Sequence, residues 1–321
     1  MALIDEVKAA VAAVAGERAS ARLDDSGRAS IVLDATRLDT GEREALERRL
    51  HGAAALPGVA EVRVLVTAER TARRILAVGS GKGGVGKSTL SANLAIALLR
   101  AGRRVGLVDA DIYGPSQPRL FGVEGIRPTA VGQKLDPIAT PAGVPLLSIG
   151  SLVEPGKALA WRGPMTGGAL GQMIDAEWGA VDTLVVDLPP GTGDIQITMI
   201  QKHKPAGAVI VSTPQDLALI DARRAIDLFR GADVPIVGLI ENMAGYACPH
   251  CGEISDPFGR GGAEAAAAEL GIPFLGRVPL EMGIREASDA GQPPALTSDD
   301  KVFAPLAAQI ADWLSATSSR P

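Results

Sequence analysis

The stretch GSGKGGVGKST, residues 79–89, limits the possible folds of this chain more than any other part of the sequence. It follows a short apolar run, ILAVGS (75–80), and precedes a segment with helical periodicity. Gly81 to Ser88 match the phosphate-loop pattern G-x-x-x-x-G-K-S completely. In such a loop the backbone N–H groups and the N-terminus of the following helix together attract phosphate. The motif in this context predicts nucleotide binding by an α/β fold.

The remainder of the chain from residue 75 repeats this alternation of short apolar runs and helical segments. The runs are nearly all apolar, as expected for strands that helices cover on both faces. We therefore expect a mainly parallel sheet with helices on both faces, joined by right-handed crossovers. The expected strands are residues 75–80, 104–110, 144–150, 182–188, 207–213, 234–242 and 272–279.

Residues 1–67 have a different pattern and predict a small α/β domain in front of the main one. Their periodicities indicate a helix, two strands, a second helix and a third strand. Residues 68–74 are polar and predict a linker, which leaves residues 75–321 as the phosphate-loop domain.

Charge and hydropathy disfavour several classes of partner. The formal net charge is −5, and no block of like charges suggests a nucleic-acid surface. No run of 18 apolar residues is present to span a membrane, and Asp5 and Glu6 precede the first apolar run, unlike the basic start of a signal peptide. We expect a cytoplasmic protein with no nucleic-acid or membrane partner.

The phosphate loop assigns chemical roles to its own side chains. Lys87 is expected to reach the β- and γ-phosphates, and the Ser88 hydroxyl is expected to bind Mg²⁺. The expected nucleotide-binding residues of the loop are Gly81, Lys82, Gly83, Gly84, Val85, Gly86, Lys87, Ser88 and Thr89.

Aspartates end two of the expected strands, where ligands bind in parallel sheets. Asp109 and Asp111 close the run VGLVDAD, and Asp109 is expected to support either Mg²⁺ or the loop that follows. Asp187 ends TLVVD and precedes the Gly/Pro-rich PPGTGD, which has the form of a magnesium-binding strand followed by a switch loop. Asp187 is therefore expected to hold Mg²⁺ through a bound water.

Cys248 and Cys251 are the only cysteines of the chain, within CPHCG, and the following GEISDPFGRGG is expected to be a loop. A C-x-x-C pair fits a redox site, half of a zinc site or the ligands of an iron–sulfur cluster. A redox pair of the thioredoxin type opens a helix in an early βαβ unit, whereas this pair follows a late strand. A closed metal or cluster site needs four ligands, and His250 is badly placed to join both thiols on one ion. A two-fold dimer supplies the missing pair.

Several stretches in order resemble the Mrp/ApbC-type iron–sulfur cluster carriers, which belong with MinD and ParA to the SIMIBI ATPases and have a deviant Walker A loop. These stretches are KGGVGKST, DADIYGPS, DLPPGTGD, STPQDLALIDA, ENM and the C-x-x-C pair, over residues 75–290. The resemblance implies that Lys82 reaches the nucleotide of a partner subunit, that Asp111 orients the attacking water and that Asn242 contacts adenine. Lys82, Lys87 and Asp111 are then the expected catalytic residues.

The resemblance further implies a homodimer that binds ATP, Mg²⁺ and a [4Fe–4S] cluster shared through Cys248 and Cys251. It implies slow Mg²⁺-dependent ATP hydrolysis and transfer of the cluster to apo iron–sulfur proteins, with an unidentified donor. Residues 1–67 resemble a degenerate form of the DUF59-type domain often fused to such carriers, in their order of elements and in LPGVAEVRV, without the acidic Asp-Pro-Glu stretch usual near its start. Two alternatives remain open: a positioning ATPase like MinD or ParA, and a regulatory ATPase dimer bridged by zinc.

Overall fold

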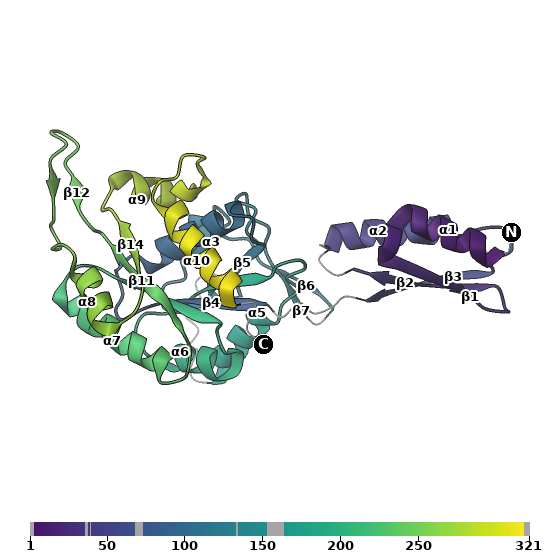
Figure 1. Ribbon diagram of the computed structural model, residues 1–321, viewed down its shortest axis with the longest axis horizontal. Helices are drawn as coiled ribbons and strands as arrows, with labels where there is room; N and C mark the ends of the chain where they lie inside the picture. Colours follow the sequence, from purple (N-terminus) through teal and green to yellow (C-terminus); the bar gives the residue numbers. More distant parts are fainter. Residues whose placement is uncertain are drawn as a thin grey trace. The chain divides into compact units, whose positions relative to one another are not determined.

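The computed structural model describes residues 3–35, 38, 40–67, 73–132, 134–152 and 164–317 (Figure 1). The chain forms two compact units that divide at residue 72. Residues 68–72 of the expected linker lie outside the described residues.

The N-terminal unit is a three-stranded sheet, in the order β1-β2-β3, with two helices. Strands β1 and β2 pair antiparallel, whereas β2 and β3 pair parallel because α2 crosses between them. Along β2 the buried Ala29, Ile31 and Leu33 alternate with exposed residues, and they pack with buried residues of both helices. The elements follow the order expected from the sequence: α1 (Leu3–Ala15), η1 (Gly16–Arg18), β1 (Ala19–Leu23), β2 (Arg28–Asp34), α2 (Thr40–Ala54) and β3 (Glu61–Thr67).

The second unit is built on a seven-stranded sheet in the order β14-β11-β10-β4-β9-β5-β8. Every neighbouring pair in this sheet is parallel. Each strand lies within one of the seven apolar runs or extends it by one residue, which confirms the predicted α/β fold. The strands are β4 (Arg74–Ser80), β5 (Val105–Asp109), β8 (Leu146–Ser148), β9 (Thr183–Asp187), β10 (Gly207–Ser212), β11 (Ile236–Asn242) and β14 (Phe274–Val278).

Helices cover both faces of this sheet. Helices α3 and α10 pack together on one face, while α7 and α8 pack against β10, β4 and β11 on the other (Figure 1). The helices are α3 (Lys87–Arg100), α4 (Gln117–Leu120), α5 (Pro164–Ile174), α6 (Asp194–Thr198), the π-helix η3 (Met199–His203), α7 (Asp216–Arg230), α8 (Gly262–Leu270), α9 (Met282–Asp289) and α10 (Phe303–Thr317), with the short 3₁₀ turns η2 (Ile149–Leu152) and η4 (Pro294–Leu296).

The amphipathic C-terminal helix α10 closes the core. Phe303, Leu306, Ile310 and Leu314 of α10 are all buried against α3 and its neighbours. Among the described residues, no helix combines the length and the apolar character that crossing a membrane requires.

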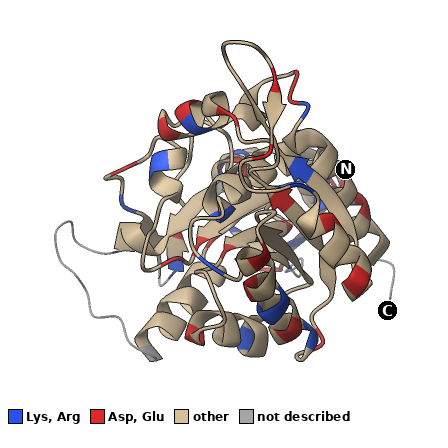
Figure 2. Cartoon of the chain, turned by 90° about the vertical axis from the view of Figure 1, so that its left-hand side faces the viewer, with Lys and Arg blue, Asp and Glu red and all other residues tan. Residues whose placement is uncertain are grey.

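Two small antiparallel hairpins stand outside the main sheet. One pairs β6 (Thr129–Val131) with β7 (Lys134–Asp136), and the other pairs β12 (Tyr246–Ala247) with β13 (Ile254–Ser255). The second hairpin corrects the expectation of an irregular loop after Cys251, and it extends away from the sheet (Figure 1). Acidic and basic residues are interspersed along the ribbon in the view of Figure 2.

Candidate functional site

The carboxyl ends of β4, β5, β9 and β11 bring the motifs of the sequence together at one edge of the sheet. The phosphate loop leaves β4 and enters α3 at Lys87. Gly81 must be glycine here, because a Cβ on it would lie 2.0 Å from the backbone carbonyl carbon of Asp221 on α7. The loop therefore passes directly against the backbone of α7.

The phosphate loop encloses a cavity of about 200 Å³. Eight of the nine loop residues expected to bind nucleotide line this cavity, and so does Asp111. The complete lining is Ser80, Lys82, Gly83, Gly84, Val85, Gly86, Lys87, Ser88, Thr89, Asp111 and Pro190. Pro190 comes from the Gly/Pro-rich segment after β9, so the expected switch loop borders the same cavity. Backbone amides, a lysine and hydroxyl groups around such a space are suited to a polyphosphate.

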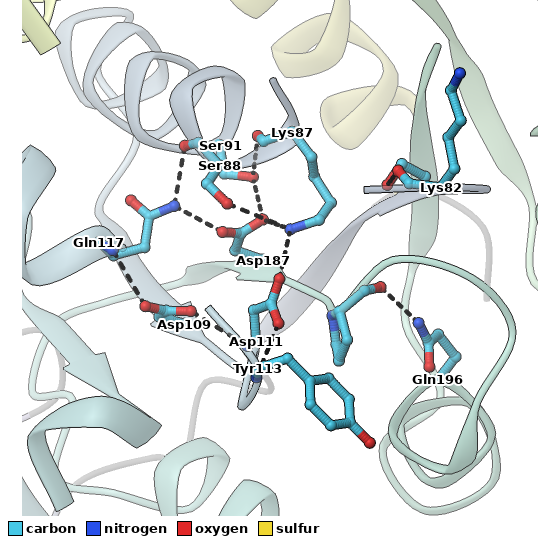
Figure 3. Close-up of polar contacts among 12 residues, drawn as sticks. Lys82, Lys87, Ser88, Ser91, Asp109, Asp111, Tyr113, Gln117, Asp187 and Gln196 are labelled. Carbon is cyan, nitrogen blue, oxygen red and sulfur yellow. Dashed lines mark hydrogen bonds and ion pairs between the residues drawn. The ribbon is translucent and has the colours of Figure 1, made fainter. Parts of the chain in front are cut away.

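Lys87 and Asp187 form the centre of a buried polar network (Figure 3). Lys87 Nζ lies 2.6 Å from Asp187 Oδ1, and the two side chains are 5% and 0% exposed. Ser91 Oγ donates to the same Asp187 oxygen at 3.0 Å, and Lys87 Nζ donates to Ser88 Oγ at 3.4 Å. A serine hydroxyl and an aspartate carboxylate are oxygen ligands of the kind that Mg²⁺ prefers, so the chemistry of Ser88 and Asp187 suits a magnesium site, while the role itself stays a prediction.

Asp109 supports the loop after β5, the second of its two expected roles. Its Oδ2 accepts hydrogen bonds from the backbone N–H of Gln117 at 3.1 Å and from Ser148 Oγ at 2.9 Å. Its Oδ1 accepts from the backbone N–H of Asp111 at 3.2 Å. Burial, reinforced by the charge of Asp187, raises the pKa of Asp109 to about 7. Both oxygens of the Asp109 carboxyl group thus already accept hydrogen bonds from the protein.

Asp111 faces the cavity from the loop that Asp109 holds. It is 8% exposed, and its Oδ2 lies 3.8 Å from Lys87 Nζ. Burial raises the pKa of Asp111 above its usual value, while the positive charge of Lys87 opposes that rise. The backbone N–H of Tyr113 donates to Asp111 Oδ1 at 3.2 Å and fixes the orientation of the carboxylate.

Asn242, at the end of β11, contacts the phosphate loop directly. Its Nδ2 donates to the Val85 carbonyl oxygen at 2.7 Å, and the residue is 7% exposed. This approach requires glycine at position 86, where φ is +79° and an added Cβ would lie 2.2 Å from Asn242 Nδ2. Contact of Asn242 with adenine remains a prediction, and its carbonyl oxygen is the acceptor available for that contact.

Lys82 extends away from the Lys87–Asp187 pair (Figure 3). Its Nζ donates to Gln215 Oε1, just before α7, at 3.5 Å, which is at the outer limit for a hydrogen bond. The backbone carbonyl of Lys82 accepts from Ser80 Oγ at 3.0 Å. The backbone at this position is therefore held while the charged end of the side chain is only loosely engaged.

The two cysteines lie in the turn of the β12–β13 hairpin. Cys248 is partly exposed and Cys251 is exposed. Hydrogen bonds from the backbone N–H groups of Cys251 and His250, together with a bond from the Cys251 side chain, lower the pKa of the Cys248 thiol. Within the described part of the chain, no group of three or more His, Cys, Asp or Glu side chains is arranged to hold a metal ion. One copy of the described chain thus offers only the pair of thiols.

The base of this hairpin is held by a buried carboxylate that sequence analysis missed. Glu241 is 0% exposed on β11, and its Oε2 accepts from the backbone N–H of Ala263 at the start of α8 at 2.9 Å. Its Oε1 accepts from Arg277 Nε of β14, also at 2.9 Å. Since the hairpin segment runs from β11 to α8, Glu241 fastens both of its ends.

Sequence analysis also missed Gln117, Ser91 and Ser148, which complete the polar network around the two aspartates. Gln117 Nε2 donates to Asp187 Oδ2 at 2.8 Å and to the Ser88 carbonyl oxygen at 2.9 Å. The only sequence signal for Gln117 is its place shortly after a strand-end aspartate and before a proline that opens a helix. Ser91 and Ser148 lie inside apolar segments, where a single serine gives no sequence signal of a functional role.

A family model described as the NUBPL iron-transfer P-loop NTPase, of the ParA group, matches residues 71–315. The chain is 46% identical over 260 residues to an iron-sulfur cluster carrier protein of Pseudomonas fragi, covering 80% of this chain and 87% of the relative.

Solved structures with the same fold include nucleotide complexes. A nucleotide-binding protein of Archaeoglobus fulgidus in complex with ADP superposes with a TM-score of 0.61 at 39% identity, over 68% of this chain and 86% of that one. The septum site-determining protein MinD of Pyrococcus horikoshii, complexed with Mg-ADP, has a TM-score of 0.55 at 22% identity, over 77% and 98% of the two chains. The second likeness bears on the fold alone.

Proposed function

The chain belongs to the NUBPL iron-transfer family of P-loop NTPases, and we propose that it is an ATP-dependent carrier that holds an iron–sulfur cluster between two copies of itself and transfers it to apoproteins. The cluster is the cargo and the recipients are apo iron–sulfur proteins. The site of action is the cytoplasm.

The phosphate-loop cavity is the proposed site of MgATP. Lys87 binds the β- and γ-phosphates, the loop amides bind the remaining phosphate oxygens, and Asn242 contacts the adenine. Ser88 and Asp187 hold Mg²⁺, which neutralises charge on the phosphates. Asp111 orients the water for hydrolysis, since its carboxylate lines the same cavity and is fixed by the backbone N–H of Tyr113.

The outward direction of Lys82 supports a role across a dimer. Among the described residues the charged end of Lys82 makes one hydrogen bond, at 3.5 Å, and it can exchange this weak contact for an anionic partner. In the proposed dimer this partner is the nucleotide of the other subunit. Lys82 stabilises the negative charge that develops on the phosphates of that nucleotide in the transition state of hydrolysis. Lys82→Ala is expected to retain ATP affinity within about twofold and to lose hydrolysis at least about tenfold. Full activity in this variant, or a wild-type protein that sediments as a monomer with MgATP, counts against the dimer.

The observation that carries the proposal is the pair of thiols at the turn of the hairpin, where Cys251 is exposed and Cys248 is partly exposed. A four-iron cluster takes four thiolates, and the chain has two cysteines. Two hairpins related by a two-fold axis complete the set, since such an axis brings a surface against its own copy. Exposure suits a cargo that must leave, and the lowered pKa of Cys248 favours the thiolate that binds iron.

Anaerobic reconstitution tests the cargo. Wild type, Cys248→Ala and the Cys248→Ala/Cys251→Ala double variant are loaded with iron and sulfide, then compared by absorbance and by iron and sulfide content per dimer. We expect about four irons per wild-type dimer and none in the double variant. Lys87→Ala is the matched control, because it alters the phosphate loop and keeps both thiols. The proposal fails if the double variant binds as much iron as wild type.

The same samples separate the alternatives. Uptake of zinc alone, one ion per dimer and with no transfer to an apo-acceptor, identifies a zinc-bridged dimer instead. A positioning ATPase like MinD needs a membrane-binding helix, but the apolar side of α10 is buried in the core. No observation on the described residues favours that alternative over cluster carriage.

A further inference from the structure

We propose that Gln117 is a positioning residue of the magnesium site, holding the Asp187 carboxylate and the Ser88 segment at a fixed spacing while Lys87 is engaged with nucleotide. The proposal rests on the MgATP site proposed above and is independent of the cluster. It concerns a side chain that does not itself touch the phosphates, so Gln117 acts through Asp187 and Ser88.

A hydrogen bond to Asp109 holds the backbone of Gln117 in place. Gln117 is 0% exposed, and its backbone N–H donates to Asp109 Oδ2 at 3.1 Å. Asp109 is held in turn by Ser148 and by the backbone of Asp111. The end of β5 thus fixes the starting point of the Gln117 side chain relative to the sheet.

The side-chain amide of Gln117 joins the two residues proposed to hold Mg²⁺. Its Nε2 donates to Asp187 Oδ2 at 2.8 Å and to the Ser88 carbonyl oxygen at 2.9 Å (Figure 3). A primary amide carries two N–H groups, so both are used in this bridge. The bridge links the end of β9 to the start of α3, and those two elements supply the proposed carboxylate and hydroxyl ligands.

The side-chain oxygen of Gln117 destabilises the fold, so filling the core does not explain a glutamine at this position. Gln117 Oε1 is buried and has no hydrogen-bond partner within the described part of the chain. A buried acceptor without a partner destabilises a fold, and an apolar side chain of similar length fills the space without that penalty. The two donated hydrogen bonds are therefore the physical reason for an amide at this place.

The two carboxylate oxygens of Asp187 accept hydrogen bonds from different residues. Oδ1 accepts from Lys87 Nζ at 2.6 Å and from Ser91 Oγ at 3.0 Å, while Oδ2 accepts from Gln117. A phosphate-loop lysine reaches the β- and γ-phosphates, so nucleotide competes with Asp187 for the Lys87 ammonium. When Lys87 turns to the phosphates, the Asp187 carboxylate keeps its hydrogen bonds from Gln117 and Ser91, which hold its orientation while Oδ1 loses its contact with Lys87.

Metal binding to the nucleotide complex tests the proposal without relying on turnover. Gln117→Leu is titrated with Mn²⁺ or Mg²⁺ in the presence of a non-hydrolysable ATP analogue, by calorimetry and by Mn²⁺ EPR. We expect the metal affinity to fall about tenfold or more, because hydrogen bonds to a charged group are lost. Affinity for the analogue in EDTA should stay within about twofold of wild type. Gln309→Leu, the same substitution on α10, should match wild type in both measurements.

A purely structural role predicts that both affinities fall together. An equal loss of analogue affinity in EDTA, or a Gln117→Leu protein with wild-type metal affinity, overturns the proposal. If Gln117→Leu does not fold, Gln117→Asn replaces it: this amide is one methylene too short for the bridge, so wild-type metal affinity in it also overturns the proposal. Wild type that binds no metal with the analogue removes the MgATP assignment as well. Failure of cluster loading alone leaves the metal titration unaffected.

Discussion

The phosphate loop and the cysteine hairpin both follow strands of the seven-stranded sheet, and the core holds them very differently. Lys87, Asp187 and Gln117 are almost completely buried and bonded to one another. The hairpin has strands of two residues each, and residues 249–257 at its outer part are exposed. Of its two thiols, that of Cys251 is exposed and that of Cys248 is partly exposed.

This difference reflects what each region has to do. A site for a polyphosphate gains affinity from groups that are already in place, because little entropy is then lost on binding. A site shared between two copies cannot be completed inside one copy, so its ligands must remain at the surface. We expect changes in the buried network of Lys87, Asp187 and Gln117 to alter binding and stability together, and changes at the hairpin turn to alter metal binding alone.

The largest expected effect is at the centre of the buried network. Lys87→Ala should lower ATP affinity by about 100-fold or more, because charge-assisted hydrogen bonds to two phosphates are lost. The measurement is calorimetric titration, with circular dichroism to verify the fold. Lys82→Ala is the matched control from the same loop and should bind ATP within about twofold of wild type. Wild-type affinity in Lys87→Ala contradicts the assignment of the loop.

Next in size is the anchor at the base of the hairpin. Glu241→Leu should reduce the free energy of unfolding by about 1–3 kcal/mol, since the buried N–H of Ala263 and the Arg277 guanidinium lose their acceptor. Urea denaturation measures this loss. Glu264→Leu is the control: its carboxylate pairs with the same Arg277, but it is 55% exposed, and we expect less than about 1 kcal/mol. Equal losses would mean that burial does not distinguish the two anchors.

A smaller effect is expected at the hairpin turn itself. The Cys248→Ser/Cys251→Ser double variant should unfold within about 0.5 kcal/mol of the metal-free wild type, because these side chains make few contacts with the core. Its ATP affinity should also be unchanged. A large loss of stability in urea denaturation would show that the turn is part of the core and would remove the contrast between the two regions.

The smallest expected effect is on the acidity of one thiol. Because the pKa of Cys248 is lowered, its thiolate forms at lower pH in the folded chain than in the unfolded chain. In metal-free Cys251→Ser, which leaves Cys248 as the single thiol, the rate of alkylation should rise with pH from a lower midpoint than in the same protein in denaturant. Identical midpoints contradict the hydrogen bonds from the backbone N–H groups of His250 and Cys251.

Much of the fold was predictable because its signals are local and repeated. The seven apolar runs became the seven strands, and the phosphate loop lies between β4 and α3 as its motif requires. The β12–β13 hairpin was missed because strands of two residues carry too little alternation to detect. The bridge made by Gln117 was missed for another reason: its partners lie 29 and 70 residues away in the sequence.

The sequence by itself determined the α/β class, the phosphate loop with its lysine and serine, and the two thiols in a glycine-rich segment, because adjacent residues encode each of these. Only the tertiary structure decided which partner each polar side chain of the site binds. It assigned Asp109 to the loop after β5, Asn242 to the Val85 carbonyl, Glu241 to the base of the hairpin and Gln117 to Asp187. A buried polar group must find its partner wherever packing brings one within about 3 Å, and that partner is set by the order of the strands in the sheet.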